Sequence, residues 1–459
     1  MYLERFYDEN LAQASYLVGC QATGEAIVID AARNIQPYLD AAAAQSLKIV
    51  AATDTHIHAD YVSGMRELAL QTGATMYLSD EGGPDWTYRF ARPQDVLVKD
   101  GYKIEIGNLV LEVMHTPGHT PEHISFLLTD KPASSQPRGL FTGDFIFVGD
   151  VGRPDLLEKA AGITGTMEAG ARQLYQSLQR VASLPDFIQL WPGHGAGSAC
   201  GKALGAVPQS TLGYEKLSNW AFACESEADF VARVLDGQPE PPYYFAEMKR
   251  INKVGPQLQA PLAPKLDLDS LEKVVKDQPW VVDGRGADAF AKAHLPGSVY
   301  LPPNTGFVNW AGWVLPYDQD FYLVARDTEQ ALGYQRALRS IGLDRLVGFF
   351  LAPTLARWVE HSGMARSSHR VRVEDLRGDE SLVDVRATSE WNAGHIEGAL
   401  HIHAGHLSRR LAEVPEEPLL YCASGNRSLI VSSLLERHGR LARDLIGGYA
   451  AWNKRPALA

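Results

Sequence analysis

Cysteine is scarce in this sequence, which has four cysteines among 459 residues. Four cysteines cannot form a disulfide framework in a chain of this length. No stretch approaches the roughly 18 uninterrupted apolar residues of a membrane span. The N-terminus also lacks the basic start and apolar core of a secretory leader. These absences predict a cytoplasmic protein without membrane contact.

Basic residues are fewer than acidic residues in this sequence. The sequence has 43 basic and 55 acidic residues, which gives a formal net charge of −12. There is no dense basic run, and aromatic residues do not alternate with basic ones, so we expect no binding to nucleic acid. Hydrophobic residues make up 45% of the chain, enough core for about three domains. We further expect a homo-oligomer.

Three side chains that can bind metal, His56, His58 and Asp60, lie within five residues and directly follow a predicted strand at 47–53. Three later segments each combine a short apolar run, a Gly or Pro turn and one such side chain. These are 110–114 before His119, 139–142 before Asp144 and 187–191 before His194. Ligands gather at strand ends in open α/β folds. The pattern therefore predicts a single metal site.

The order H-x-H-x-D, G-H-T, G-D and P-G-H resembles the metallo-β-lactamase-fold superfamily over about residues 1–250. Members that hydrolyse esters or amides usually carry a second histidine directly after the aspartate of the first motif, where it helps to hold a second metal ion. This sequence has Tyr61 at that position. A phenol with a pKa of about 10 is a poor ligand at neutral pH. The two-metal hydrolytic interpretation is therefore weakened.

Within that superfamily, the sequence most resembles the persulfide dioxygenase branch, in which one Fe(II) is held by two histidines and one aspartate. The resemblance implies His56, His119 and Asp144 as ligands of one Fe(II) per chain. Such a set leaves three positions for water, dioxygen and a substrate sulfur. Four further residues would orient the ligands, hold water or fill the site. They are His58, Asp60, Tyr61 and His194.

A second motif begins at Cys422, which follows a predicted strand at 418–421 and precedes a helical pattern at 429–438. Backbone N–H groups of the loop, the helix dipole and Arg427 should favour the thiolate. Cysteine-dependent phosphatases usually show Cys-x5-Arg, whereas this loop is Cys-x4-Arg, and a shorter loop suits one sulfane sulfur. The other loop residues are Ala423, Ser424, Gly425, Asn426 and Ser428.

The C-x-x-G-x-R pattern, together with 384–386 and 394–399, resembles the rhodanese sulfurtransferase family over about residues 364–459. Five residues of this segment have counterparts 101 positions earlier. The earlier set is Asp283, Arg285, Phe290, His294 and Gly297. The same offset places Phe321 opposite Cys422, and no cysteine lies between Cys224 and Cys422. The earlier unit should therefore be structural, without sulfurtransferase activity.

Together these patterns predict an α/β chain with an N-terminal αββα metallo-β-lactamase sandwich and two rhodanese-like domains with parallel sheets. The expected boundaries are 1–250, 251–362 and 363–459, with a Pro-rich linker at 237–264. Glycines and small residues at 23–24 and 107–108 predict two hairpins, and apolar periodicity predicts a helix over 166–184.

The whole chain resembles bacterial fusions of persulfide dioxygenase and sulfurtransferase in sulfide detoxification. This implies oxidation of a low-molecular-weight persulfide by O2 to sulfite, with Cys422 exchanging sulfane sulfur between persulfide, sulfite and thiosulfate. Cys200 is a candidate thiol relay, whereas Cys20 and Cys224 are expected to be structural. Two alternatives stay open: a zinc thioester hydrolase of the glyoxalase II type joined to a rhodanese, and a sulfur-binding scaffold with a vestigial metal site. The thiol that carries the persulfide stays open.

Overall fold

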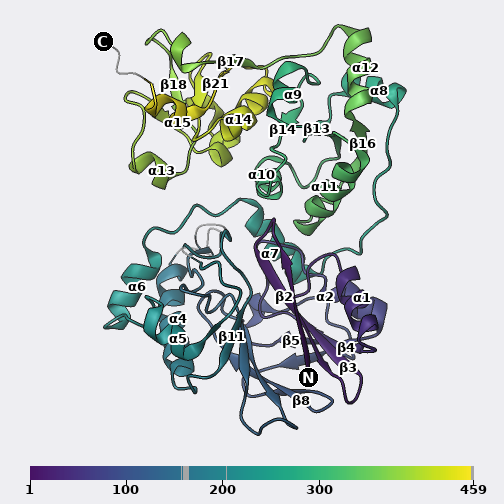
Figure 1. Cartoon of the computed structure of the whole chain (residues 1–459), viewed down its shortest axis with the longest axis vertical. Helices are drawn as coiled ribbons and strands as arrows, with labels where there is room; N and C mark the ends of the chain where they lie inside the picture. The colour runs from purple at the N-terminus through teal and green to yellow at the C-terminus, as the bar shows by residue number, and fades with distance from the viewer. Residues whose placement is uncertain (157, 159–164, 203, 456–459) are drawn as a thin grey trace. The chain divides into compact units, whose positions relative to one another are not determined.

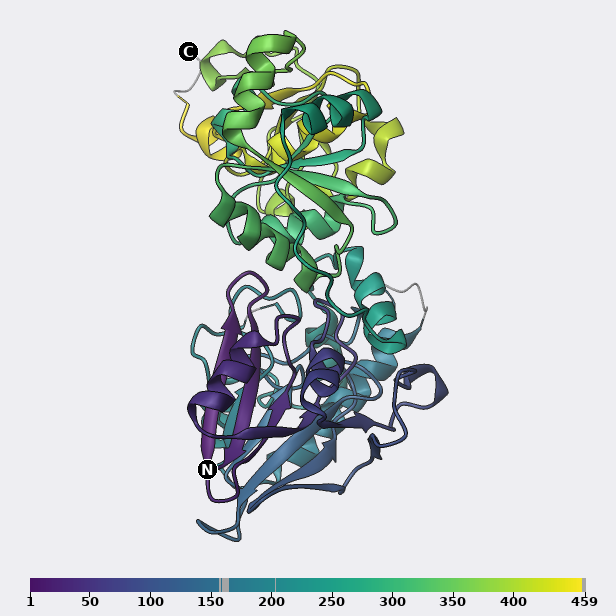
Figure 2. The same cartoon turned by 90° about the vertical axis from the view of Figure 1, so that its right-hand side faces the viewer.

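The computed structural model describes residues 1–459 except 157, 159–164, 203 and 456–459 (Figures 1 and 2). The chain forms two compact units. The first comprises Met1–Gln259 and Arg339–Gly342, and the second comprises Ala260–Leu338 and Leu343–Ala459. Among the described residues, no helix has the length and apolar character required to cross a membrane.

The first unit contains two six-stranded sheets. Strands of the first sheet follow chain order: β1 (Tyr2–Asp8), β2 (Gln13–Cys20), β3 (Glu25–Ile29), β4 (Lys48–Thr53), β5 (Thr75–Ser79) and β6 (Val96–Val98). The first three are antiparallel, and the last four run parallel. The predicted hairpin at 23–24 is confirmed by the β2–β3 pair.

The second sheet has the order β12-β11-β10-β9-β8-β7. Its strands are β7 (Lys103–Ile106), β8 (Leu109–His115), β9 (Ile124–Asp130), β10 (Gly139–Gly143), β11 (Gln189–Pro192) and β12 (Ser210–Thr211). Strands β10 and β11 are parallel, and the other pairs are antiparallel. The hairpin predicted at 107–108 is the β7–β8 connection.

Three apolar clusters show that this unit has four layers. One cluster joins residues of both sheets, among them Tyr16, Phe126 and Trp191. A second packs α1 (Gln36–Ala44) and α2 (Met65–Thr72) on the first sheet. The third packs helices on the second sheet, and these are α4 (Thr166–Ala182), α5 (Leu212–Ser218) and α6 (Glu227–Leu235). Figure 1 shows the two helical layers flanking the sheets. The predicted αββα sandwich is confirmed, as is the helix predicted from residue 166.

The second unit contains two parallel sheets, as predicted. The four-stranded sheet has the order β14-β13-β15-β16, with β13 (Trp280–Asp283), β14 (Val299–Tyr300), β15 (Phe321–Ala325) and β16 (Leu346–Leu351). Its helices are α8 (Leu268–Asp277), α9 (Ala287–Lys292), α10 (Phe307–Val314), α11 (Thr328–Ser340) and α12 (Ala352–Ser362).

The five-stranded sheet has the order β17-β21-β20-β18-β19. Its strands are β17 (His369–Val371), β18 (Leu382–Asp384), β19 (Leu400–His401), β20 (Leu419–Tyr421) and β21 (Arg443–Leu445). The accompanying helices are α13 (Thr388–Asn392), α14 (Asn426–Arg437) and α15 (Gly448–Asn453). Apart from the edge strand β17, the strand order repeats that of the four-stranded sheet.

The residues of the internal repeat make the same contacts in both sheets. Arg285 binds both carboxylate oxygens of Asp283, and Arg386 binds both oxygens of Asp384. The next pair of the repeat is a stack of an aromatic ring on a histidine. Phe290 lies 3.9 Å from His294 between ring centroids, and Trp391 lies 3.5 Å from His395. The repeat thus preserves an aspartate–arginine ion pair and an aromatic–histidine stack in both sheets.

Two details differ from the sequence-based expectations. Asp283 pairs with Val324, whereas the equivalent Asp384 pairs with Tyr421. The residue matching Cys422 is therefore Ala325, so the predicted match with Phe321 is wrong, because the offset shortens before β15. The predicted linker also contains an ordered helix, α7 (Tyr244–Val254), whose apolar face includes the buried Met248.

Candidate metal centre and cysteine loop

The candidate ligands of the first unit lie just beyond strand ends. His56 follows β4, His119 follows β8, Asp144 follows β10 and His194 follows β11. The two sheets bring these four connections together, so residues separated by up to 138 positions in sequence become neighbours. Buried strands on each side hold the connections in place.

Three ligand atoms converge in a buried site. Asp144 Oδ2 lies 3.9 Å from His56 Nε2 and 3.6 Å from His119 Nε2. Each residue is at most 1% exposed. Among the described residues, His56 Nε2 and Asp144 Oδ2 have no hydrogen-bond partner. Buried polar atoms are normally satisfied, so these two unpaired atoms, together with His119 Nε2 beside them, fit a metal ion.

Both imidazoles are in the neutral form that metal binding requires. Burial and the neighbouring histidines hold the pKa of His56 well below its usual range. Burial lowers the pKa of His119 to about 4, although Asp144 opposes this shift. Each ring therefore offers a lone pair at neutral pH.

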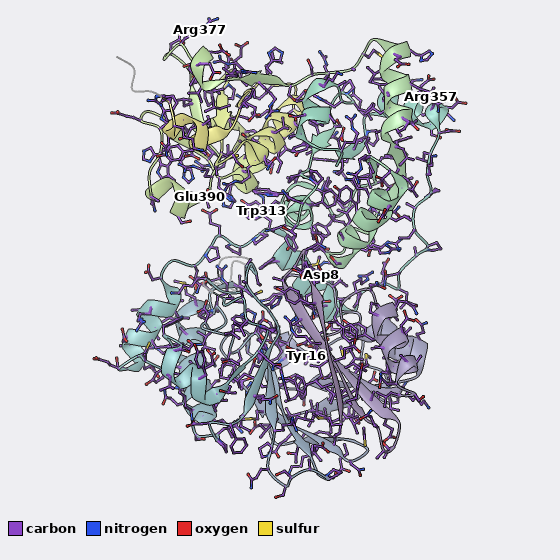
Figure 3. The ribbon with its side chains drawn as sticks, in the orientation of Figure 1. Asp8, Tyr16, Trp313, Arg357, Arg377 and Glu390 are labelled. Carbon is purple, nitrogen blue, oxygen red and sulfur yellow. The ribbon has the colours of Figure 1, made fainter. Side chains whose placement is uncertain are left out.

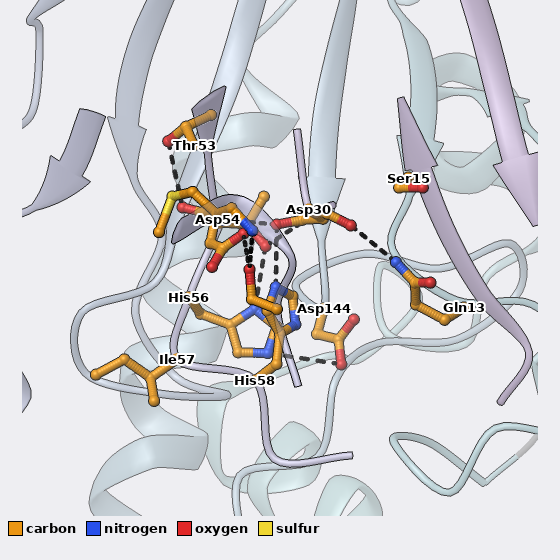
Figure 4. Close-up of polar contacts among 12 residues, drawn as sticks. Gln13, Ser15, Asp30, Thr53, Asp54, His56, Ile57, His58 and Asp144 are labelled. Atoms are coloured by element: carbon orange, nitrogen blue, oxygen red, sulfur yellow. Dashed lines mark hydrogen bonds and ion pairs between the residues drawn. The ribbon is translucent and has the colours of Figure 1, made fainter. Parts of the chain in front are cut away.

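Hydrogen bonds fix the orientation of the two rings. His119 Nδ1 donates to the carbonyl oxygen of Arg153 at 2.9 Å. His56 Nδ1 lies 3.0 Å from Thr55 Oγ1, whose hydroxyl donates to Asp30 Oδ2 at 3.0 Å. Asp30, His56 and Asp144 are labelled in Figure 4. Because the Thr55 proton goes to Asp30, the His56 contact requires a proton on Nδ1. In both rings Nε2 is thus the atom left to bind metal.

His58 and Tyr61 are turned toward Asp30. His58 Nε2 lies 3.1 Å from Asp30 Oδ1, and the Tyr61 hydroxyl donates to the Asp30 carbonyl oxygen at 3.1 Å. Burial disfavours charge on His58, but Asp30 outweighs it and raises the pKa of His58 to about 9. Burial holds the pKa of Tyr61 well above its usual range. Both side chains are thus engaged with Asp30.

His194 bridges two carboxylates. Its Nδ1 lies 2.6 Å from Asp144 Oδ1, and its Nε2 lies 2.7 Å from Asp60 Oδ2. Both ring nitrogens are thereby engaged, and the bridge leaves Oδ2 of Asp144 directed at the histidines. Cys200 lies beside Asp60 and His194, with ligand atoms within 4.8 Å of one another. Burial holds the pKa of the Cys200 thiol well above its usual range.

The structure adds residues that the motifs did not reveal. Asp30 directly follows the apolar strand β3, so the pattern of a polar side chain after an apolar run could have revealed it. Glu122 accepts a hydrogen bond from the backbone N–H of Ile57 at 2.8 Å, and no local pattern indicated this contact. A buried ion pair follows Asp144 in the chain, in which Arg153 Nε lies 2.7 Å from Asp155 Oδ1.

The cysteine of the second unit lies in a tight loop between β20 and α14. Cys422 is 1% exposed, and its Sγ accepts hydrogen bonds from Gly425 N at 3.1 Å and from Ser428 Oγ at 3.6 Å. Gly425 has a φ of 102°, which favours glycine, and α14 begins at the next residue. The loop therefore directs donors at the sulfur, as the sequence predicted.

Arg427 has a carboxylate partner that the sequence did not predict. Both terminal nitrogens of the guanidinium bind Glu390, and Nη2 lies 2.7 Å from Oε1. Figure 3 labels Glu390, which belongs to α13. The pair holds the pKa of the Glu390 carboxyl below its usual range. The carboxylate offsets much of the positive potential that Arg427 brings to the loop.

Comparisons with known proteins match both units of the chain. The model of the metallo-beta-lactamase superfamily matches residues 9–194, and that of the rhodanese-like domain matches residues 370–455. A solved metallo-beta-lactamase from Staphylococcus aureus subsp. aureus COL is 43% identical, with a TM-score of 0.69. The match covers 76% of this chain and 99% of that one. The chain therefore belongs to the metallo-beta-lactamase superfamily and carries a C-terminal rhodanese-like domain.

Two curated relatives differ in activity. A hydroxyacylglutathione hydrolase of Tolumonas auensis is 35% identical over 40% of this chain and 62% of its own length. The mitochondrial persulfide dioxygenase of Homo sapiens is 28% identical over 42% of this chain and 67% of its own length. The chain thus spans about two thirds of the length of these relatives.

Proposed function

We propose that the first unit oxidises a low-molecular-weight persulfide to sulfite, with one Fe(II) held by His56, His119 and Asp144. In the overall reaction R–S–SH, O2 and water give R–SH, sulfite and two protons. A ferrous ion with two imidazoles and one carboxylate supplies oxygen activation and has open positions for substrate. The observation that supports this proposal is the convergence of His56, His119 and Asp144, whose ligand atoms lie within 4.8 Å of one another. His58 Nε2 and the Tyr61 hydroxyl contact Asp30, and His194 Nδ1 contacts Asp144 Oδ1.

The protein's own groups prepare this site. Thr55 and the Arg153 carbonyl hold the proton on Nδ1 of each histidine, so Nε2 is free. His194 holds one oxygen of Asp144 and leaves the other for the metal. Burial keeps bulk water from the three ligand atoms, which strengthens electrostatic interactions there.

We propose that Cys422 performs the second reaction. Its thiolate attacks the outer sulfur of a persulfide, which breaks the S–S bond, forms Cys–S–SH and releases the thiolate R–S⁻. Sulfite then attacks that outer sulfur, which gives thiosulfate, restores the Cys422 thiolate and frees the proton that converts R–S⁻ to R–SH. The Gly425 N–H and the Ser428 hydroxyl stabilise negative charge on the sulfur in both steps. The reverse exchange uses the same groups.

We assign residues 251–362 to a rhodanese-like domain without activity, between the dioxygenase domain at 1–250 and the sulfurtransferase domain at 363–459. Ala325 stands where the other domain has Cys422. Contacts with α14 support a structural role, since Arg437 donates to the Gly297 carbonyl at 3.0 Å and His294 lies 3.1 Å from Glu436. We also propose a cytoplasmic homo-oligomer.

A zinc-dependent thioester hydrolase is the second candidate for the first unit. The observation that favours it is the higher identity to a hydroxyacylglutathione hydrolase than to a persulfide dioxygenase. The test is oxygen uptake by anaerobically purified protein with glutathione and coenzyme A persulfides, compared with hydrolysis of S-lactoylglutathione. Persulfide-dependent oxygen uptake supports the dioxygenase; thioester hydrolysis without it supports the hydrolase.

A further inference from the structure

A cavity of about 650 Å³ lies beside the candidate metal centre. One wall is formed by Ile57, between His56 and His58, and by Gly118, which precedes His119. Residues of α4 and of α7, the helix in the predicted linker, also line the cavity. The cavity is therefore placed to hold the part of a substrate that extends away from the reacting sulfur.

Lys249 of α7 is the unusual side chain of this cavity. Its Nζ is buried and has no hydrogen-bond partner among the described residues. It lies 5.1 Å from the centroid of the Trp86 ring, which also lines the cavity. Burying an ammonium group without a hydrogen-bonded anion is costly. An anion in the cavity would remove that cost.

None of the charged side chains near Lys249 forms a hydrogen bond with its Nζ among the described residues. Arg250 and Lys253 also line the cavity, but Arg250 binds Glu247, and Lys253 donates to the Asp85 carbonyl. Glu122 acts on Lys249 electrostatically. Its Oε1 accepts a hydrogen bond from Ile57 N, and its Oε2, like Lys249 Nζ, has no hydrogen-bond partner among the described residues. Burial lowers the pKa of Lys249 to about 8, so the group is largely charged at neutral pH.

Building on the proposed function, we propose that Lys249 binds the anionic group of the thiol that carries the persulfide. The carrier is thus a carboxylate- or phosphate-bearing thiol. Arg250 and Lys253 of the same helix add positive potential, which favours an anion over a neutral or cationic carrier. Lys249 is accordingly a residue of substrate specificity and takes no part in the oxidation itself.

A binding titration tests this assignment without the reaction. S-methylglutathione presents carboxylates, and S-methyl-coenzyme A presents phosphates; each is titrated calorimetrically into wild type, Lys249→Met and Lys249→Arg. We expect at least one to bind wild type and to lose about tenfold or more in affinity in Lys249→Met, with most affinity kept in Lys249→Arg. The tighter ligand identifies the anion. Lys131→Met, which removes an exposed lysine paired with Glu105, is the control and should bind as wild type does.

Two results overturn the inference: neither ligand binds wild type, or Lys249→Met binds as tightly as wild type. Lys249→Gln is a second neutral variant, and thermal unfolding checks that both variants fold. The kinetic test uses glutathione, coenzyme A and 2-hydroxyethyl persulfides. Lys249→Met should raise KM about tenfold for an anionic carrier, with kcat and the KM for the neutral persulfide unchanged. Absence of oxygen uptake by wild type with all three would defeat the proposed function, whereas the titration would still decide the role of Lys249.

Discussion

The hydroxyl of Thr55 connects the candidate metal centre to Asp30, and its removal tests this connection. Thr55→Val replaces the hydroxyl with a methyl group of similar size. His56 Nδ1 then loses a contact of 3.0 Å, and Asp30 Oδ2 loses a donor at 3.0 Å. The backbone N–H of Thr55 still donates to Asp30 Oδ1 at 2.6 Å, so the loop keeps its anchor.

The expected loss of stability in Thr55→Val follows from the two buried groups, His56 Nδ1 and Asp30 Oδ2, that lose a hydrogen-bond partner. Each costs about 1–3 kcal/mol, so we expect the metal-free protein to lose roughly 2–4 kcal/mol of unfolding free energy after local relaxation. A ligand whose orienting partner is removed usually loses about 10–100-fold in metal affinity. We therefore expect weaker binding of the metal in Thr55→Val, and not only lower stability.

The assay is anaerobic competition for Fe(II) against a chelator, with urea unfolding of the metal-free proteins. Thr53→Val is the matched control, since Thr53 is also buried and its hydroxyl donates to the Tyr77 carbonyl at 2.7 Å, away from the ligand atoms. The control should lose stability and keep the metal affinity of wild type. Equal metal affinity in Thr55→Val and Thr53→Val would refute the role of Thr55.

Three further predictions follow from the sites. Cys422→Ser should leave oxygen uptake largely intact while sulfite replaces thiosulfate as product; unchanged thiosulfate output would refute the division of labour. Glu390→Gln should lower the KM for thiosulfate by about threefold to tenfold, because Arg427 no longer shares its charge, whereas Glu413→Gln, in an exposed pair with Arg410, should leave it unchanged. An unchanged or higher KM for thiosulfate in Glu390→Gln would contradict the claim that Glu390 offsets the charge of Arg427. Because the pKa of Lys249 is about 8 under the influence of burial, Glu122 and Cys200, the KM for an anionic persulfide should rise above pH 8 in wild type and stay flat in Lys249→Arg; parallel profiles would contradict it. The lowered pKa of Lys249 also makes the stability of the protein depend on pH. In the unfolded chain the lysine has a pKa of 10.5 and binds its proton more tightly than in the folded protein, so its contribution to the free energy of unfolding rises between about pH 8 and 10.5.

Local sequence pattern was enough to predict the three candidate ligands that the fold brings together, His56, His119 and Asp144. An apolar run followed by a turn and a histidine or aspartate specifies a strand end, and strand ends meet in this fold. The pattern could not reveal that Thr55 binds Asp30 or that Arg427 binds Glu390, because those contacts depend on packing between distant segments. These two contacts are visible only in the folded structure.

The Pro-rich segment at 237–264 is predicted as a linker, and the boundary between the two units falls within it, after Gln259. The prolines do not reveal that this segment also contains α7, whose buried face includes Tyr244, Phe245 and Met248. That helix carries Lys249, so the cavity could not be predicted from the sequence. One prediction is wrong. Phe321 was matched to Cys422 by a constant offset, which fails where the connection before β15 changes length. Strand register corrects the match to Ala325.

Metal content measured together with oxygen consumption tests the central claim most directly. Protein purified without oxygen and reconstituted with Fe(II) should hold one iron per chain and consume oxygen only when persulfide is added. Asp144→Ala should lose both the iron and the oxygen uptake. Two zinc ions per chain, with thioester hydrolysis and no persulfide-dependent oxygen consumption, would contradict the account.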